Sequence, residues 1–318
     1  MARFTLPRDL YHGKGALEAL KTFEGKKAII CVGGGSMKRF GFLDRAKQYL
    51  EEAGMEIELF GPADFDTRTE VELSTIENLI TSGEWDVIML YADEPDAFVD
   101  LRLKSEQAGI PWIGYIMPAA TNCGTVFIGD TPEQRAIANY EKILEYVEKN
   151  WDLYKDLDVI EVAVAGHPSN ENCDYRAAHT GELLEANTDY NFKVVYNQGA
   201  VGTDAGVTFA ENCLQAHPNV KIWLANADDA AIGIYQALNN VGKGSDADQI
   251  ITGIDAGSSF RELCAAGTAF RFSSYCTSSS CAETLIEVVP KLCNGEYAYQ
   301  ENIAIPTTTV SIDNIDMK

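Results

Sequence analysis

Short apolar runs alternate with amphipathic stretches of helical length, and this alternation constrains the fold more than any other feature of the chain. The first series places apolar runs at 26–32, 55–60, 86–91 and 110–116. The second series places them at 159–165, 192–198, 220–226, 249–255 and 268–275. Continuous apolar strands joined by helices are typical of parallel strands buried on both faces. The pattern therefore predicts an α/β fold with doubly wound sheets.

Two series of similar size predict two lobes of the same architecture. No Pro-, Gly- or Ser-rich tract is long enough to act as a flexible linker, so we expect the chain to cross between lobes directly. The expected crossings are 117–122, 275–277 and 304–307. The expected lobes are 1–118 with 277–304, and 119–276 with 305–318.

The charge of the chain is strongly negative and unevenly distributed. The net charge of −23 argues against nucleic acid and anionic membrane surfaces as partners, because both bind basic patches. Of the 25 Lys and Arg and 48 Asp and Glu, residues 1–60 hold 10 and 8, a net charge of +2, which leaves −25 for residues 61–318. This break indicates that the two segments have different histories.

The N-terminal residues carry Arg3, Arg8 and Asp9 and no uninterrupted apolar segment of the export-signal type. We therefore expect the chain as written to stay in the cytoplasm. No apolar run approaches the ~20 residues that span a bilayer, so we expect no membrane insertion.

The 8 cysteines form no CxxC motif, and no Cys/His cluster has the spacing of a zinc site. We expect reduced, scattered thiols. Cys276 and Cys281 enclose the residues Thr-Ser-Ser-Ser. This spacing admits a redox pair, but a polar hinge loop that enters a helix is the simpler interpretation.

The order of motifs from about residue 61 to the end resembles the type I periplasmic binding proteins for sugars. The segments that carry the resemblance are 75–98, 106–116, 211–238, 249–272 and 291–316. The resemblance implies two doubly wound, Rossmann-like lobes joined by a hinge of three crossings. It also implies a binding protein, not an enzyme, that closes around a small polar ligand such as a sugar or polyol. The implied protein partner is the permease of an ABC transporter, and members of the family are exported.

Residues 1–60 differ from that family and resemble the N-terminus of iron-containing alcohol dehydrogenases. The segment includes the turn VGGGS at 32–36 between an expected strand and an expected helix. It is itself a β/α/β unit, so it could replace the first strand, helix and strand of a binding protein. We therefore interpret the chain as a chimera, and we expect 26–60 to pair in the same sheet as 86–91.

The N-terminal segment bears on two alternative functions. An NAD(P)- and iron-dependent dehydrogenase needs a dinucleotide turn and metal-ligating histidines. VGGGS lacks the GxGxxG spacing, and no pair among His12, His167, His179 and His217 has the i, i+4 spacing of metal ligands on one helix face. We therefore expect no cofactor, no metal and no catalytic residue. The sensing core of a transcriptional regulator needs a helix-turn-helix ahead of it, whereas 1–60 predicts strand, helix and strand.

The resemblance to the sugar-binding family implies two ligand contacts in the second lobe. Arg176 matches the arginine at the start of a second-lobe helix that holds ring hydroxyls, with Gly181 at the expected distance. Asp255 follows an expected strand and matches the family's hydroxyl-accepting aspartate. The simpler interpretations are a surface arginine and a helix N-cap aspartate.

Other expected ligand contacts depart from the family's residue types. Tyr91 and Tyr275 replace polar residues. Ala227 stands where an asparagine normally contacts sugar, so either Asn226 or Asp228 is expected to compensate. The contacts of the first lobe are expected at Ser36, Met37 and Phe40, within the dehydrogenase-like segment. A pocket with tyrosines but few amides argues against a standard pentose or hexose.

Overall fold

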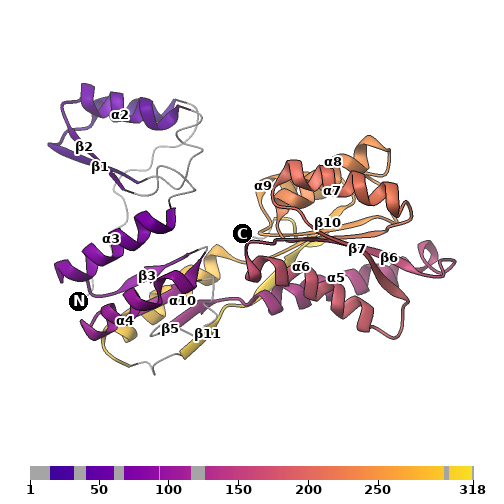
Figure 1. Ribbon diagram of the computed structural model, residues 1–318. Helices are drawn as coiled ribbons and strands as arrows, with labels where there is room; N and C mark the ends of the chain where they lie inside the picture. Colours follow the sequence, from indigo (N-terminus) through magenta and orange to yellow (C-terminus); the bar gives the residue numbers. More distant parts are fainter. Residues whose placement is uncertain are drawn as a thin grey trace. The chain divides into compact units, whose positions relative to one another are not determined.

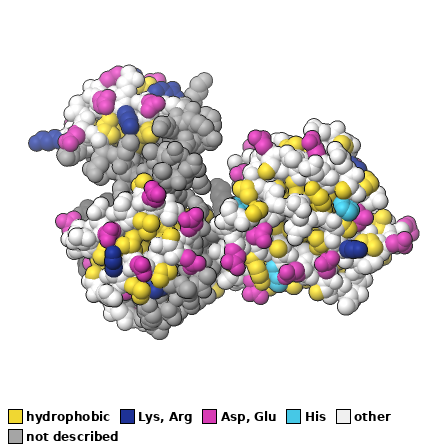
Figure 2. All heavy atoms as spheres, in the orientation of Figure 1, with side chains coloured by type: hydrophobic (Ala, Val, Ile, Leu, Met, Phe, Trp, Pro, Cys, Tyr) yellow, Lys and Arg dark blue, Asp and Glu magenta, His cyan; other side chains and the backbone are white. Residues whose placement is uncertain are grey.

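The computed structural model describes residues 15–31, 41–60, 68–92, 94–115, 126–296 and 301–316. The chain divides into two compact units, Met1–Ile88 with Ala92–Trp112, and Met89–Tyr91 with Ile113–Lys318. The residue ranges expected for the two lobes stay a prediction. On the face shown in Figure 2, acidic side chains are scattered among the described residues and outnumber Lys and Arg, in keeping with the net charge of −23.

The first unit begins with the expected β/α/β motif. Its elements are η1 (Ala16–Thr22), β1 (Lys27–Cys31), α2 (Phe42–Glu52), β2 (Glu56–Phe60), α3 (Arg68–Ser82), η3 (Pro95–Phe98) and α4 (Val99–Gln107). β1 and β2 pair in parallel, with the helix between them in sequence. α2 buries Leu43, Ala46 and Leu50, whose spacing puts them on one face of the helix.

Among the described strands, β1 and β2 form a two-stranded sheet of their own. The prediction that 26–60 pairs in the same sheet as 86–91 is therefore wrong, because the strand in 86–91 belongs to a different sheet. An apolar run indicates a buried strand, but it does not specify which strand supplies the backbone partners.

A four-stranded sheet has the order β11-β5-β4-β3. Its strands are β3 (Ile88–Leu90), β4 (Trp112–Tyr115), β5 (Val126–Gly129) and β11 (Glu301–Ala304). β5 pairs in parallel with both β4 and β11. β5 was not predicted from the sequence: its residues were expected in the second lobe, whereas they pair with strands expected in the first. The crossing to the next sheet therefore follows β5.

A six-stranded sheet has the order β12-β10-β9-β8-β6-β7 and is parallel except for β12. Its strands are β6 (Ile160–Gly166), β7 (Phe192–Gly199), β8 (Ile222–Ala225), β9 (Ile250–Ile254), β10 (Phe270–Cys276) and β12 (Thr307–Val310). α5 (Pro132–Lys149) precedes β6, and the helices between the strands are α6 (Glu171–Ala186), α7 (Thr203–Ala216), α8 (Asp228–Asn240) and α9 (Ser258–Ala265). α10 (Ser278–Cys293) follows β10 and packs against β5. The short helices η4 (Trp151–Leu153) and η5 (Ile312–Asn314) complete the second unit.

Alternate residues of β6 point to opposite faces of this sheet. Ala163 and Ala165 join a core cluster with α7, α8 and α9, whereas Val162 and Val164 join a second cluster with α5 and α6. Figure 1 shows these two groups of helices on opposite faces of the sheet. Strands buried on both faces explain the continuous apolar runs in the sequence, and the doubly wound prediction is confirmed.

Glycines allow α7 and α8 to pack at close range. A Cβ on Gly233 of α8 would lie 2.1 Å from the carbonyl oxygen of Thr203 in α7. A Cβ on Gly206 of α7 would lie 2.3 Å from the carbonyl oxygen of Ala230 in α8. No real Cβ tolerates such distances, so these two positions require glycine.

Candidate functional site

The carboxyl ends of the parallel strands in the six-stranded sheet carry most of the expected site residues. Open α/β sheets bind ligands at this edge. β8 ends directly before Asn226, and β9 ends directly before Asp255. Arg176 lies on α6, which follows β6.

Asp255 lies in a strained turn rather than at a helix cap. Its φ is 99° and that of Ala256 is 47°, so two consecutive non-glycine residues have left-handed backbone conformations. Such residues cost about 1–3 kcal/mol each and cluster at functional sites. The N-cap of α9 is Gly257, so the simpler interpretation of Asp255 as an N-cap is wrong. The turn leaves the Asp255 side chain 62% exposed.

A buried network holds this turn in place. The Ser273 hydroxyl accepts the backbone N–H of Ala256 at 2.8 Å and donates to Oδ1 of Asp228 at 2.6 Å. Oδ2 of Asp228 accepts the backbone N–H of Gly257 at 2.8 Å. Burial raises the pKa of Asp228 to about 7, although the hydrogen bonds that its carboxylate accepts from Ser273 and from the backbone of Gly257 oppose the shift. The network fixes the backbone on both sides of Ala256 and so fixes the position of Asp255.

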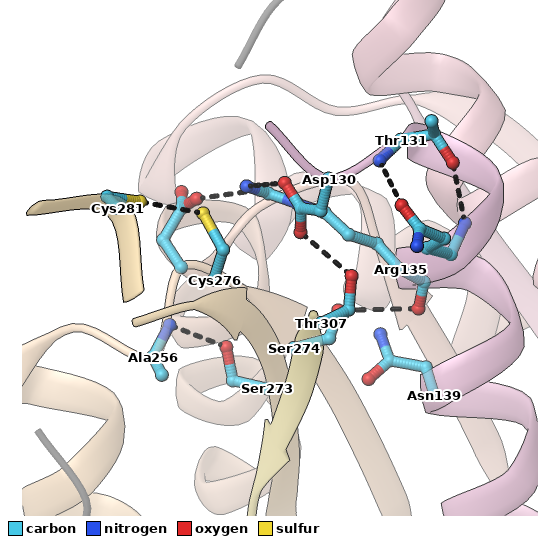
Figure 3. Close-up of polar contacts among 12 residues, drawn as sticks. Asp130, Thr131, Arg135, Asn139, Ala256, Ser273, Ser274, Cys276, Cys281 and Thr307 are labelled. Atoms are coloured by element: carbon cyan, nitrogen blue, oxygen red, sulfur yellow. Dashed lines mark hydrogen bonds and ion pairs between the residues drawn. The ribbon is translucent and has the colours of Figure 1, made fainter. Parts of the chain in front are cut away.

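Arg135 is a buried arginine that the sequence analysis did not select. Its Nε and Nη2 atoms donate to the two carboxylate oxygens of Asp130 at 2.7 and 2.9 Å. Its Nη1 atom donates to Oδ1 of Asp255 at 3.3 Å. Burial lowers the pKa of this guanidinium, but the hydrogen bonds and charge of Asp130, helped by Asp255, outweigh it, so the pKa is raised. Figure 3 shows Arg135 extending toward Asp130.

Arg176 is buried on α6, so its interpretation as a surface arginine is wrong. Burial lowers the pKa of its guanidinium, and the positive charge of Arg135 lowers it further. Cys173, Asp255 and Tyr91 act against this shift. Their influence on the pKa of Arg176 indicates that Arg176, Asp255 and Tyr91 lie in one region of the fold, although they are far apart in the sequence.

Asn226 is buried, and its amide holds backbone. Its Nδ2 group donates to the carbonyl oxygens of Ala165, Gly166 and Ala200 at 3.0, 2.9 and 2.7 Å. Ala165 and Gly166 are the last two residues of β6, and Ala200 directly follows β7. Asn226, which directly follows β8, therefore ties together the carboxyl ends of three strands. A direct contact between Asn226 and a ligand stays a prediction, and this geometry leaves its Nδ2 group occupied.

Ser274 and Tyr275 point to opposite faces of β10. The Ser274 hydroxyl donates to the carbonyl oxygen of Arg135 at 3.4 Å, on the α5 face. The Tyr275 ring packs with the core cluster of α7, α8 and α9, and the Arg261 guanidinium lies 5.5 Å from its centre. The structure thus separates Tyr275 from the group around Arg176. Ser36, Met37 and Phe40 lie outside the described residues.

The described residues contain no cluster of three or more His, Cys, Asp and Glu side chains that could hold a metal ion. None of the helices in the described part of the chain is long and apolar enough to cross a membrane.

A family model for the periplasmic binding protein domain matches residues 40–296. The chain belongs to the periplasmic binding protein family. This membership agrees with the expectation of a binding protein rather than an enzyme, and with the type I fold expected from the sequence.

Solved structures with this fold include solute-binding proteins of ABC transporters. One from Bacillus halodurans with bound myo-inositol has a TM-score of 0.66 and 21% identity, with 92% of this chain and 96% of that chain covered. One from Actinobacillus succinogenes with bound D-allose has a TM-score of 0.65 and 20% identity, with 93% and 100% covered.

Sequence relatives of this periplasmic binding protein come from two classes. A protein named as a candidate rhizopine-binding protein, from Rhizobium meliloti, is 27% identical over 88% of this chain and 87% of its own length. An NADPH-dependent butanol dehydrogenase from Clostridium saccharobutylicum is 42% identical over 123 residues, 38% of this chain. The chain spans only 29% of that enzyme, less than a third of its length.

The dehydrogenase resemblance is longer than the segment 1–60. Residues 1–60 can supply at most 60 of the 123 matched positions, so at least half of the match lies beyond residue 60. The two matches cover 38% and 88% of the chain, so at least 26% of the chain resembles both proteins. A single junction at residue 60 therefore does not describe this binding protein fully.

The hinge of this periplasmic binding protein contains Asp130 and Thr307. Asp130 lies between β5 of the four-stranded sheet and α5, and Thr307 begins β12 of the six-stranded sheet. The Thr307 hydroxyl donates to Oδ2 of Asp130 at 3.0 Å (Figure 3). Because Asp130 also holds Arg135, a chain of polar contacts runs from two crossings to Asp255. Of the residues in this series of contacts, only Asp255 was predicted from the sequence as a site residue.

Proposed function

We propose that the protein binds a small polyhydroxylated solute, a sugar or cyclic polyol, at the carboxyl edge of the six-stranded sheet. The observation that carries the proposal is the grouping of Arg176, Asp255 and Tyr91, which come from three separate parts of the chain. Two relatives are named for such ligands: a D-ribose/D-allose-binding protein from Pseudomonas aeruginosa, 26% identical over 63% of this chain and 61% of its own length, and the myo-inositol complex described above.

The chemistry of these residues fits neighbouring hydroxyls. A guanidinium donates two parallel hydrogen bonds, and a carboxylate accepts from hydroxyl donors. The phenol of Tyr91 can both donate and accept, and its ring offers an apolar face to the carbons of a sugar. Arg135 takes one oxygen of Asp255 and leaves the other carboxylate oxygen available, since that side chain is 62% exposed.

The proposed partner is the permease of an ABC transporter, which would receive the solute. The solved relatives support this class of partner because they are named as solute-binding proteins of such transporters. A cytoplasmic location, expected from the N-terminal residues, stays a prediction, and the relative with bound D-allose is described as periplasmic.

The experiment is a thermal-shift screen with myo-inositol, D-ribose, D-allose and D-fucose, followed by calorimetry on the strongest ligand. Arg176→Lys and Asp255→Asn should each weaken binding by about 2–4 kcal/mol, roughly 30- to 1,000-fold in Kd. Arg271→Lys is the matched control, because its guanidinium binds the carbonyls of Gln249 and Asp246 away from the carboxyl edge. Unchanged affinity in both site variants would remove the two residues from the site. A screen without any thermal shift would argue against the ligand class.

A further inference from the structure

Two buried cysteines face each other where the chain passes from β10 to α10. Cys276 is the last residue of β10, and Cys281 lies in the first turns of α10. Their sulfur atoms are 3.6 Å apart, and the residues are 8% and 5% exposed. Figure 3 shows the two thiol groups pointing toward each other. A disulfide bond of about 2.05 Å needs the sulfurs to approach by about 1.5 Å more, a distance that side-chain rotation covers.

The helix start explains why these two positions meet. Thr277 is the N-cap of α10, and its hydroxyl oxygen accepts the backbone N–H of Ser280 at 3.1 Å. Cys276 therefore occupies the position before the cap, and Cys281 the fourth helical position. Residues at these two positions pack against each other as a hydrophobic staple. A staple made of two cysteines has the geometry for a covalent link.

The pair lies among groups from both sheets of the second unit. Cys276 pairs in register with Thr307, the residue that donates to Asp130. Burial raises the pKa of the Tyr115 phenol, on β4 of the four-stranded sheet, and the neighbouring Cys281 thiol raises it further. A bond between the sulfurs would therefore fix the joint between β10 of the six-stranded sheet and α10, which packs against β5 of the four-stranded sheet.

We propose that Cys276 and Cys281 are a reversible dithiol–disulfide pair whose oxidation fixes the β10–α10 joint of the hinge. The oxidant is a small-molecule disulfide. One cysteine thiolate attacks it, forms a mixed disulfide and releases one thiolate of the oxidant. The second cysteine thiolate then attacks the mixed disulfide and releases the other thiolate. The protein loses two protons and two electrons, and the oxidant becomes two thiols.

Burial governs how fast the pair reacts. It raises the pKa of Cys276 to about 12, with the charge of Asp130 adding to the shift, so little thiolate is present at neutral pH. Thiol exchange needs the thiolate and access to it, so the pair reacts when this segment opens. The closed ring is only six residues long, so its entropic stabilisation is at the low end for disulfides, and the bond constrains the joint locally.

The direct test treats the native full-length chain with glutathione disulfide, blocks the remaining thiols and maps the linked peptides by mass spectrometry. We expect a 276–281 disulfide that a reductant reverses. Cys213→Ser should keep it, because that buried cysteine lies in a separate core cluster, whereas Cys281→Ser should abolish it. Oxidation of the exposed Cys293 while Cys276 and Cys281 stay reduced would overturn the proposal, as would a link from either cysteine to another partner.

A second probe uses the unsubstituted chain, so its result does not depend on whether a cysteine variant folds. Phenylarsine oxide binds two neighbouring thiols at once, so it should protect both Cys276 and Cys281 from alkylation in the unmodified chain. Alkylation of both residues in its presence would overturn the proposal.

The effect on the hinge rests on the proposed function and is measured separately. The Kd for the strongest ligand of the screen should differ by about five-fold or more between the oxidised and reduced protein. Equal values would overturn the hinge role. If no sugar or polyol binds, the proposed function fails, while the mapped disulfide still decides whether the pair forms.

Discussion

The Nη1 atom of Arg135 lies 3.3 Å from Oδ1 of Asp255, so a buried guanidinium on α5 orients the exposed carboxylate that directly follows β9. The same guanidinium binds both oxygens of Asp130, a residue of the hinge. Arg135 thus links the hinge to the proposed ligand site through one planar group. This link makes the two carboxylates unequal: Asp130 is fully buried and depends on Arg135, whereas Asp255 does not.

Arg135→Met should destabilise the protein by about 3–5 kcal/mol, because it leaves the Asp130 carboxylate buried without its positive partner. Asp255→Asn should cost less than about 1 kcal/mol, because that carboxylate is 62% exposed and its ion pair is screened by water. Urea denaturation of both variants measures the difference. Equal losses in the two variants would contradict this account of Arg135.

Asp228 should make the protein less stable as the pH rises from about 4 to 7. Its folded pKa of about 7 lies above the ordinary value, so the folded state binds the proton more tightly than the unfolded state. The stabilising contribution is complete below the unfolded pKa and is lost as the pH rises through 7. The expected loss is on the order of a few kcal/mol.

The measurement for Asp228 is the free energy of unfolding at several pH values between 4 and 8. Asp228→Asn removes the titrating group and should flatten the profile in that window. Asp313→Asn is the control, an exposed aspartate on η5 whose substitution should leave the slope unchanged. A variant profile as steep as that of the natural chain would assign the titration to another group.

Gly233→Ala should destabilise the protein strongly, because the added Cβ would meet the backbone of α7 at 2.1 Å. Gly181→Ala on α6 is the matched comparison, since its Cβ would meet only side chains, the nearest at 3.1 Å. Overpacking of this kind costs about 1–3 kcal/mol, with the larger value where backbone must move. Thermal unfolding of both variants should place Gly233→Ala well below Gly181→Ala.

The protein should not oxidise butanol with NADP or NAD, even with added ferrous iron. The chain spans 29% of the butanol dehydrogenase that it resembles, and it has only 4 histidines, none paired at i, i+4. The assay follows reduced cofactor by absorbance, with the authentic dehydrogenase as a positive control. Turnover that depends on this chain and is abolished by a chelator would restore the enzyme hypothesis.

The site residues show where inference from sequence stops. Arg176 and Asp255 could be predicted because the order of motifs resembles a known family, which has an arginine and an aspartate at the matching positions. Arg135 was not, because its role depends on two carboxylates 5 and 120 residues away that only the folded chain brings to it. The strained backbone at Asp255 also left no mark in the sequence, since neither Asp255 nor Ala256 is a glycine.

The sequence by itself determined the strands β6 to β10, the helices between them and their doubly wound arrangement, because burial on both faces demands continuous apolar runs. It also determined the family, through motifs in a fixed order. Only the tertiary structure decided which strands pair: it separated β1 and β2 from β3, and it placed the short strand β5 beside β4. It alone brought Arg135 to Asp255. Apolar periodicity records which side chains leave water, whereas strand partners and polar contacts depend on geometry that no local pattern encodes.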